Sequence, residues 1–400
     1  MPRVSVVLAA YNYAHYIGKA IDSALAQTYR DREIIVVDDE STDDTMAVLE
    51  RFGSRIRVFR HTNRGLAATR NAGIGRASGS YVALIDADDV WEPQHLERTV
   101  ECLDRADAST VGAFSGWVMI DAGGRILPHT RRVRRGVFGL RDFVHVAPFP
   151  PSAVVLRRAA VENAGMFDER IPSTEDWDMW LRLTAAGGSF VAVERCLCRY
   201  RVHSTNMSRD PYSMRAGGLR ALEKLFANPT LAPDVRAQQA AAFAHVHARA
   251  SSQLYASGHA AEAAAALTAA AREWPDILLE DETHWAVICA DQPPGYKGSA
   301  QLLDLPRGED RIIGALESVV ADPALRRRAK GRAYRALARL AYGQRRMAAA
   351  RGYVRDAITA DPALWSDREM VGTFVKSLAG GRTIEALSGW RGRRGSPPRQ

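Results

Sequence analysis

The segment Tyr81–Trp91, Tyr-Val-Ala-Leu-Ile-Asp-Ala-Asp-Asp-Val-Trp, joins an apolar run to three carboxylates. The run Val82–Ile85 does not alternate with polar residues, which is typical of a strand buried on both faces. Asp86, Asp88 and Asp89 follow it directly. Carboxylates this close raise one another's pKa unless a cation lies among them, and their hard oxygens favour Mg²⁺ or Mn²⁺ with phosphates as co-ligands. The alternative is a charged loop after a core strand.

A second carboxylate pair, Asp38 and Asp39, ends the apolar run of residues 33–39. Further strands are predicted at 4–10 and 55–60, with helical patterns at about 14–27, after 41 and at 66–77. Strands and helices that alternate in this way form a parallel sheet with helices on both faces. Ligands bind beyond the carboxyl ends of such strands, where both acidic clusters fall. The sequence therefore predicts a nucleotide and metal site at this edge.

Three nucleotide-binding patterns are absent from the sequence. No Gly-x-Gly-x-x-Gly follows the first strand and no Gly-x-x-x-x-Gly-Lys-Ser/Thr occurs, which argues against a dinucleotide fold and a P-loop. The glycines of Asn71–Gly75 lie in a helical pattern, and we interpret them as close-packing positions. A sugar nucleotidyltransferase would need a loop rich in glycine and arginine after the first strand, and Tyr11–His15 is not one.

Seven motifs occur in a fixed order, namely Val4–Ala10 with Tyr11-Asn12, Val37–Asp43, Asn63–Gly65 with Arg70-Asn71, Asp86–Asp89, Gly165–Asp168, Glu175–Arg182 and Tyr200–Ser204. This set resembles the family 2 inverting glycosyltransferases of the GT-A fold, over about residues 3–209. The resemblance implies an α/β nucleotide-diphospho-sugar transferase fold with a Rossmann-like mixed sheet. The sequence departs from the family at Glu40, where glycine is usual, so the turn after Asp39 is expected to differ.

The resemblance implies a nucleotide pocket formed by Ala10, Tyr11, Asp39, Arg70 and Asp86. Asp39 would accept hydrogen bonds from the base, uracil or thymine, because a carboxylate is a pure acceptor and an imide offers an N–H. Arg70 would stabilise phosphate charge, and Asp86 would approach the ribose or an outer-shell water. The alternatives are a helix cap for Asp39 and a helix-surface position for Arg70.

The same resemblance implies a divalent cation, Mn²⁺ or Mg²⁺, that bridges the two phosphates of the donor. Asp88 would be its direct ligand. His203, in Tyr200-Arg-Val-His, would be a second protein ligand or a phosphate contact. A surface or packed position is the alternative for His203.

The catalytic base implied by the family is Asp176, in the motif Glu175-Asp-Trp-Asp. It would accept the proton of an acceptor hydroxyl as the oxygen attacks the anomeric carbon, with inversion in a single displacement. Glu175 and Trp177 are weaker candidates for acceptor binding. Without the other motifs, acids here would simply complement the helix dipole. Arg131–Ser152, which mixes basic, aromatic and proline residues, is the predicted acceptor-reading segment.

Composition and charge bound the protein class. The chain has 400 residues, 46% of them apolar, which predicts two or three domains with proper cores. Four cysteines without zinc spacing, no long apolar run and no signal peptide predict a cytoplasmic protein. Residues 1–200 hold 25 Lys+Arg against 26 Asp+Glu, whereas residues 201–400 hold 29 against 20. This basic half is either a solvated surface or a peripheral contact with anionic lipid at the inner face of the cell membrane. No nucleic-acid recognition motif accompanies it.

The chain becomes alanine-rich and helical after about Pro211. Two tetratricopeptide-like hairpins are predicted, in Phe243–Trp274 around Ser257–His259 and in Tyr334–Pro362 around Tyr342–Gln344. The predicted domains are a catalytic domain at 1–210, a helical linker at 211–235, an all-α domain at 236–380 and a basic, disordered tail at 381–400. The all-α domain would bind a partner protein or shape the acceptor site.

Two functions of different class follow. The first is a metal-dependent inverting glycosyltransferase that moves a sugar from a UDP- or dTDP-sugar to a hydroxyl of a glycan or lipid-linked acceptor, in surface polysaccharide biosynthesis. The second is a catalytically inactive GT-A scaffold whose helical domain binds partner proteins. The presence of Asp39, Asp88, Asp176 and His203 argues against a decayed site and favours the enzyme.

Overall fold

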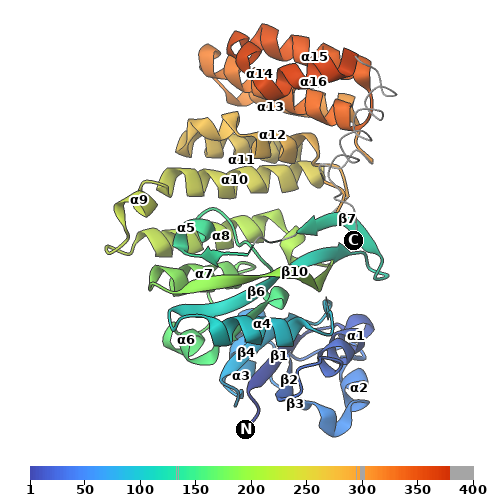
Figure 1. Ribbon diagram of the computed structural model, residues 1–400, viewed down its shortest axis with the longest axis vertical. Coiled ribbons are helices and arrows are strands. Elements are labelled where there is room, and N and C mark those ends of the chain that lie inside the picture. Colours follow the sequence, from blue (N-terminus) through green and yellow to red (C-terminus); the bar gives the residue numbers. More distant parts are fainter. Residues whose placement is uncertain (132, 134, 294, 298–301, 379–400) are drawn as a thin grey trace, which may run out of the picture. The chain divides into compact units, whose positions relative to one another are not determined.

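The computed structural model describes residues 1–131, 133, 135–293, 295–297 and 302–378 (Figure 1). Two compact units divide the chain, Met1–Phe243 and the part from Ala244 onward. The predicted linker at 211–235 lies within the first unit, and the predicted tail at 381–400 lies outside the described residues. Among the described helices, none combines the length and apolar character needed to cross a bilayer.

The first four major strands form the predicted parallel layer, in the order β3-β2-β1-β4. Their bounds, with those of the helices between them, are β1 Val4–Ala10, α1 Ala14–Leu25, β2 Arg32–Asp38, α2 Thr45–Glu50, β3 Arg57–Arg60, α3 Leu66–Ile74 and β4 Tyr81–Asp86. All seven residues of β1 are buried, because the sheet is covered on both faces. The predicted alternation of strands and helices is confirmed.

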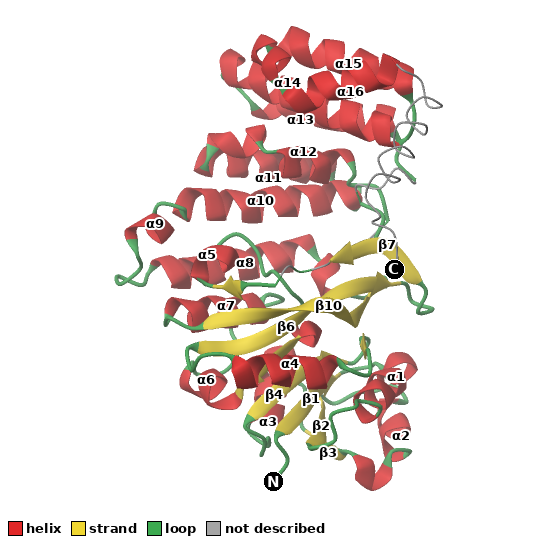
Figure 2. Ribbon diagram, viewed as in Figure 1, coloured by secondary structure: helices red, strands yellow, loops and turns green. Residues whose placement is uncertain are grey.

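The sheet continues beyond β4 with strands of mixed direction, in the order β9-β6-β10-β5. Strand β9 is antiparallel to β4 and β6, whereas β10 is parallel to β6. The remaining strands are β5 Val90–Trp91, β6 Thr110–Ile120, β7 Ile126–Arg131, β8 Val137–Phe138, β9 Val154–Arg157 and β10 Ser189–Arg201. The predicted mixed sheet is therefore present (Figure 2).

Helices complete the first unit, with bounds α4 His95–Arg105, α5 Leu140–Phe143, α6 Arg158–Asn163, α7 Glu175–Ala185, α8 Pro211–Phe226 and α9 Pro233–Arg236. Helix α3 lies close to β1 because Gly73 has no side chain: a Cβ there would collide with Val7 Cγ1. This confirms the predicted packing role of that glycine. Strand register then places Ala10 beside Asp38 and Ala9 beside Asp86, which brings the acidic strand ends to one edge.

The second unit is helical, as predicted. Its elements are α10 Gln239–Ala256, which starts in the first unit, α11 Ala260–Glu273, α12 Asp281–Ile288, α13 Leu305–Val319, α14 Pro323–Gly343, α15 Met347–Ala360 and α16 Arg368–Leu378, with 3₁₀ turns η4 Pro275–Leu279 and η5 Pro362–Ser366. The first predicted hairpin turns at residues 257–259 as expected. The second turns at 344–346, later than predicted, because Arg345 rather than Gly343 takes the left-handed position, with φ 61°.

Candidate active site

Two predicted metal ligands meet at the carboxyl edge of the sheet. Asp88 follows β4 and His203 follows β10, and the Oδ2 atom of Asp88 lies 2.8 Å from Nε2 of His203. Both side chains are buried. Thr205 Oγ1 lies 2.9 Å from the other ring nitrogen, Nδ1, and Asn206 Nδ2 donates to Asp88 Oδ2 at 3.3 Å. The sequence analysis missed Thr205 and Asn206, although they directly follow the motif that ends at Ser204.

Aromatic rings enclose His203. The rings of Tyr13 and Tyr16 lie 6.1 and 5.1 Å from its imidazole, and the Arg201 guanidinium lies 4.8 Å from the Tyr16 ring. Burial, followed by the nearby charge of Asp88, raises the pKa of Tyr13. Tyr13 is thus held neutral beside the acidic edge, where it can donate a hydrogen bond. No single motif in the sequence identified these two tyrosines.

The third acid of the cluster, Asp89, has a different environment. Its Oδ1 accepts the Arg201 N–H at 2.8 Å, and the Arg201 Nε donates to the backbone oxygen of Asp88 at 2.7 Å. Burial, then the charges of Asp88 and Asp86, raise the pKa of Asp89 well above its ordinary value. Asp89 therefore ties β10 to the end of β4 rather than facing the open edge.

The Asp88–His203 pair suits a divalent cation that arrives with phosphates. A carboxylate oxygen is a ligand for Mn²⁺ and Mg²⁺, and a neutral imidazole is a common metal ligand. Within the described residues, no group of three or more His, Cys, Asp or Glu side chains could hold a metal alone. Among the described residues, Asp88 and His203 could supply two donors, and phosphate oxygens and water would have to supply the rest, as is usual for Mg²⁺.

The predicted base-binding residue, Asp39, holds a loop. Its Oδ1 and Oδ2 accept the backbone N–H groups of Arg64 and Gly65 at 2.8 and 2.9 Å. The next residue, Glu40, has φ 65°, and its carboxylate accepts the N–H of Asn63 at 3.0 Å. Two consecutive carboxylates therefore bind three consecutive N–H groups. Glycine adopts such a left-handed φ without strain, so Glu40 holds this turn at a cost in backbone strain.

The two other residues at the predicted nucleotide edge, Ala10 and Tyr11, close β1. The backbone oxygen of Ala10 accepts the Asp39 N–H at 2.8 Å, and Tyr11 is exposed. Asn12 follows with φ 59°, and its side-chain oxygen accepts the N–H of Thr42 at 2.7 Å. The turns after β1 and β2 are thereby joined, which fixes the rim near Asp39.

Arg70 is buried between two carboxylates that come from different parts of the fold. Its guanidinium donates to Asp86 Oδ1 at 2.5 Å and to Glu175 Oε1, and its side chain is only 3% exposed. Burial lowers the pKa of Arg70, but Asp86 and Glu175 raise it by more, so it stays charged. Arg70 thus joins the end of β4 to the start of α7, a position that its helical spacing did not predict.

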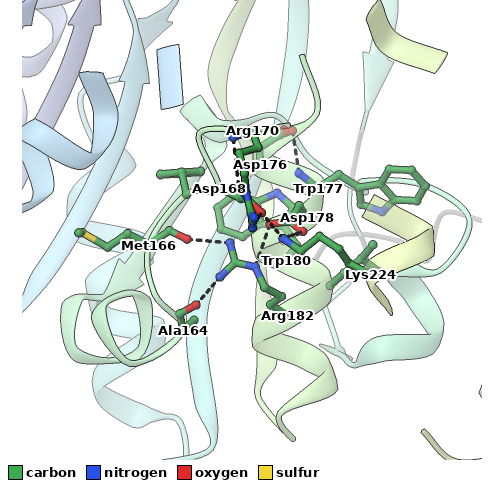
Figure 3. Close-up of polar contacts among 12 residues, drawn as sticks. Ala164, Met166, Asp168, Arg170, Asp176, Trp177, Asp178, Trp180, Arg182 and Lys224 are labelled. Atoms are coloured by element: carbon green, nitrogen blue, oxygen red, sulfur yellow. Dashed lines mark hydrogen bonds and ion pairs between the residues drawn. The ribbon is translucent and has the colours of Figure 1, made fainter. Parts of the chain in front are cut away.

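Asp176 occupies the first turn of α7. Burial and then the charge of Glu175 raise the pKa of Asp176 to about 7, despite the opposing effect of Arg70. One oxygen, Oδ1, accepts the N–H of Trp177 at 2.7 Å (Figure 3). The Trp177 ring is buried and donates from Nε1 to the backbone oxygen of Phe143 at 2.7 Å. A carboxyl group with this pKa can take up a proton at neutral pH.

Ion pairs below Asp176 fix helix α7 (Figure 3). Lys224 of α8 lies 2.6 Å from Asp178 and 2.7 Å from Asp168. Arg182 lies 2.8 Å from Asp178 and also donates to the backbone oxygen of Met166 at 2.7 Å. Helices α7 and α8 and the segment after α6 are therefore cross-linked around the buried Asp178 carboxylate.

Comparisons with known proteins point to one family. Residues 5–164 match the family model described as Glycosyl transferase family 2. An uncharacterized glycosyltransferase of Nostoc sp. (strain PCC 7120 / SAG 25.82 / UTEX 2576) is 33% identical over 221 residues, 51% of this chain and 66% of the relative. One from Rickettsia bellii (strain RML369-C) is 30% identical over 217 residues, 52% of this chain and 31% of the relative. The chain thus spans between about a third and two thirds of the length of these relatives.

A solved structure shows the same fold. The mannosyltransferase PcManGT from Pyrobaculum calidifontis, solved in complex with GDP-Man and Mn²⁺, is similar with a TM-score of 0.50 and 19% identity, over 86% of this chain and 87% of that chain. The chain therefore combines an α/β GT-A fold with a C-terminal helical region, as predicted.

Proposed function

Because the N-terminal part of this chain belongs to glycosyl transferase family 2, we propose that it transfers a sugar from a nucleotide-diphospho-sugar to a hydroxyl group. The observation that carries the proposal is the chain Asp86–Arg70–Glu175, with Asp176 next along α7. It holds the base candidate beside the edge where a donor would lie. We further propose a UDP- or dTDP-sugar as donor, a glycan or lipid-linked acceptor, and a role in surface polysaccharide biosynthesis.

The donor would lie along the ends of β1, β2 and β4. Asp39 holds the loop Asn63–Gly65, and both would line the base pocket with Tyr11. Asp86 would face the ribose, and its ion pair with Arg70 would keep the carboxylate in place. Because both Arg70 contacts are to carboxylates, its proposed effect on the phosphates acts at longer range than a direct hydrogen bond.

Asp88 and His203 would hold a divalent cation, Mn²⁺ or Mg²⁺. When bound, such an ion neutralises the charge that develops on the departing diphosphate. Tyr13 and Tyr16 would keep the imidazole facing Asp88. Thr205 would orient the ring through Nδ1, as outer-shell partners of metal-binding histidines do.

Asp176 would act as the general base. Its pKa of about 7 allows it to take the proton of the acceptor hydroxyl as that oxygen forms a bond to the anomeric carbon. The bond from this carbon to the diphosphate breaks in the same displacement, so the anomeric configuration inverts. Glu175 and Trp177, the predicted acceptor contacts, are both buried, and their proposed role is to set the position of α7. The proposed acceptor-reading segment remains Arg131–Ser152, whose residues 132 and 134 lie outside the described residues.

Thermal unfolding with UDP, dTDP or GDP tests donor class and metal together. Each nucleotide is measured with Mn²⁺, with Mg²⁺ and with EDTA, in the wild type and in Asp88→Ala. We expect one nucleotide to raise the unfolding temperature only with metal, and Asp88→Ala to abolish the shift. Asp210→Ala, an exposed helix cap, is the matched control.

No shift under any condition would contradict the enzyme proposal and leave the scaffold, with a partner bound by the helical region, as the remaining function. A shift that does not depend on metal would support the donor site and contradict the proposed metal site. The proposed location, in the cytoplasm and peripheral at the inner face of the cell membrane, is tested separately by sedimentation with anionic vesicles.

A further inference from the structure

The second unit contains one arrangement of elements twice. Helices α10, α11, η4 and α12 recur as α14, α15, η5 and α16. Three of the four pairs start 87 residues apart, at Ala260 and Met347, Pro275 and Pro362, and Asp281 and Arg368, whereas α10 and α14 start 84 apart, at Gln239 and Pro323. The turns also correspond, because Gly258 and Arg345 both have positive φ, at 85° and 61°. Each position in the first copy can therefore be compared with its counterpart in the second.

In the first copy, the face formed by η4 and α12 is covered by α13. Leu278 and Ile288 are 1% and 0% exposed, and they share one core cluster with Leu305 and Ile312 of α13. Gly308 of α13 makes the close approach possible, because a Cβ there would lie 2.9 Å from Ile288 Cγ2. A β-branched side chain on one helix thus packs against a glycine on the next.

In the second copy, the described residues leave the same face uncovered. The counterparts of Leu278 and Ile288 are Trp365 and Val375, which are 67% and 57% exposed. Leu378, one turn beyond Val375, is 62% exposed. Gly372, one turn before Val375, would place a Cβ with no atom within 4 Å. We call Trp365, Gly372, Val375 and Leu378 the end face. Val375 and Leu378 are three residues apart on one helix and so neighbour each other on its surface. Exposed apolar groups that adjoin one another mark an interaction site.

We propose that the end face binds the end face of a second copy of this chain, with α16 packed on α16. The α12–α13 contact supports this pairing, because it places a β-branched residue of one helix against a glycine of the other. Helix α16 carries both, in Val375 and Gly372, and both are accessible. A two-fold axis would place Val375 of each copy on Gly372 of the other, so the surface is complementary to itself.

The charges around the end face are compatible with such a pair. Glu369 is 61% exposed and Lys376 is exposed, so the face is flanked by both signs. Two copies related by a two-fold axis therefore do not meet as surfaces of one charge. The proposal does not depend on the proposed function, because every residue involved lies in the second unit.

Sedimentation velocity of the full chain over a wide concentration range tests the proposal. We expect a dimer that dissociates on dilution. Val375→Lys should weaken it by at least about tenfold, since a buried ammonium would replace an apolar contact. Gly372→Val should weaken it similarly by blocking the close approach, while the monomer accommodates the new side chain in open space. Ala348→Lys, at an exposed position on α15, is the control and should leave the dimer intact.

A wild type that stays monomeric at every concentration would overturn the proposal. Hydrogen exchange of α16 would then identify what takes the place of the second copy. Slower exchange in the full chain than in a chain that ends at residue 378 would indicate that residues 379–400 cover the face, and equal exchange that they do not. A dimer that survives both Val375→Lys and Gly372→Val would also overturn the proposal, because its interface would lie elsewhere.

Discussion

Asp88 and His203 lie 115 residues apart in the chain, yet their side chains meet with Oδ2 2.8 Å from Nε2. The contact joins the end of β4 to the end of β10 and closes the acidic edge of the sheet. Thr205 Oγ1 lies 2.9 Å from Nδ1 of the same ring. Since a hydroxyl can donate or accept, it supports either tautomer of the imidazole.

The first prediction concerns this hydroxyl. Thr205→Val keeps the side-chain shape and removes the partner of Nδ1, so Mn²⁺ affinity in the presence of UDP should fall by about 10- to 100-fold. Electron paramagnetic resonance of free Mn²⁺ measures the affinity without turnover. Thr205→Ser, which retains the hydroxyl, should bind as the wild type does. Equal affinities in all three proteins would exclude the hydroxyl from any metal role.

The second prediction concerns Asp176. Asp176→Asn should lower kcat by about 10²- to 10⁴-fold, the usual contribution of a general base, and leave the UDP-induced thermal shift unchanged. The wild-type rate should increase with pH through about 7, because only the deprotonated carboxylate accepts the proton. A rate that is flat between pH 5 and pH 9, at saturating donor, would contradict the assignment.

The same group has an effect on stability. Its folded-state pKa is raised, so between the ordinary value of 3.8 and about 7 the folded protein holds a proton that the unfolded chain has lost. The free energy of unfolding therefore falls across this window as pH rises. Asp176→Asn should remove this decline, and urea unfolding at pH 4 and pH 8 compares the two proteins.

The third prediction concerns Arg70. Arg70→Met leaves Glu175 and Asp86 without their shared cation, and the free energy of unfolding should fall by about 3–5 kcal/mol. Arg64→Met is the control, since Arg64 and its partner Glu169 are largely exposed, and it should cost at most about 1 kcal/mol. Adding Glu175→Gln to Arg70→Met should restore part of the loss. If Arg70→Met and Arg64→Met lowered the free energy of unfolding equally, the contacts of Arg70 would contribute no more to stability than an exposed ion pair.

The fourth prediction concerns the left-handed residue Glu40. Glu40→Gly removes the bond to the Asn63 N–H but also relieves the strain of φ 65°, so its net effect should be small. Glu40→Ala loses the bond and keeps the strain, and should be less stable than Glu40→Gly by about 1–2 kcal/mol. Chemical denaturation of the two variants gives this difference. Alanine as stable as glycine would mean that the turn relaxes to a negative φ.

The sequence predicted most of the parts that depend on local pattern. Apolar runs that end in acids located β2 and β4, and the parallel rule placed Asp38 and Asp86 on one edge. Arg70 shows where local pattern fails: its helical spacing fits a surface as well as a core. The burial of Arg70 is favourable only because it pairs with Glu175, which lies 105 residues further along the chain. The predicted position of the second hairpin turn was also wrong. Gly343 gave the stronger local signal for a turn, but Arg345 takes the left-handed conformation.

The position of β10 has a consequence for how the protein is made. This strand lies between β6 and β5 in the sheet, and the chain reaches β10 only after β5 and β6 have been synthesised. A nascent chain that has emerged through β6 carries the acids that follow β2 and β4 but not His203. Until β10 is inserted, Asp89 lacks its hydrogen bond from the Arg201 N–H, and strands β5 and β6 lack the strand that lies between them. Ribosome-bound chains whose emerged part ends before or after residue 203 should therefore differ sharply in their ability to retain nucleotide.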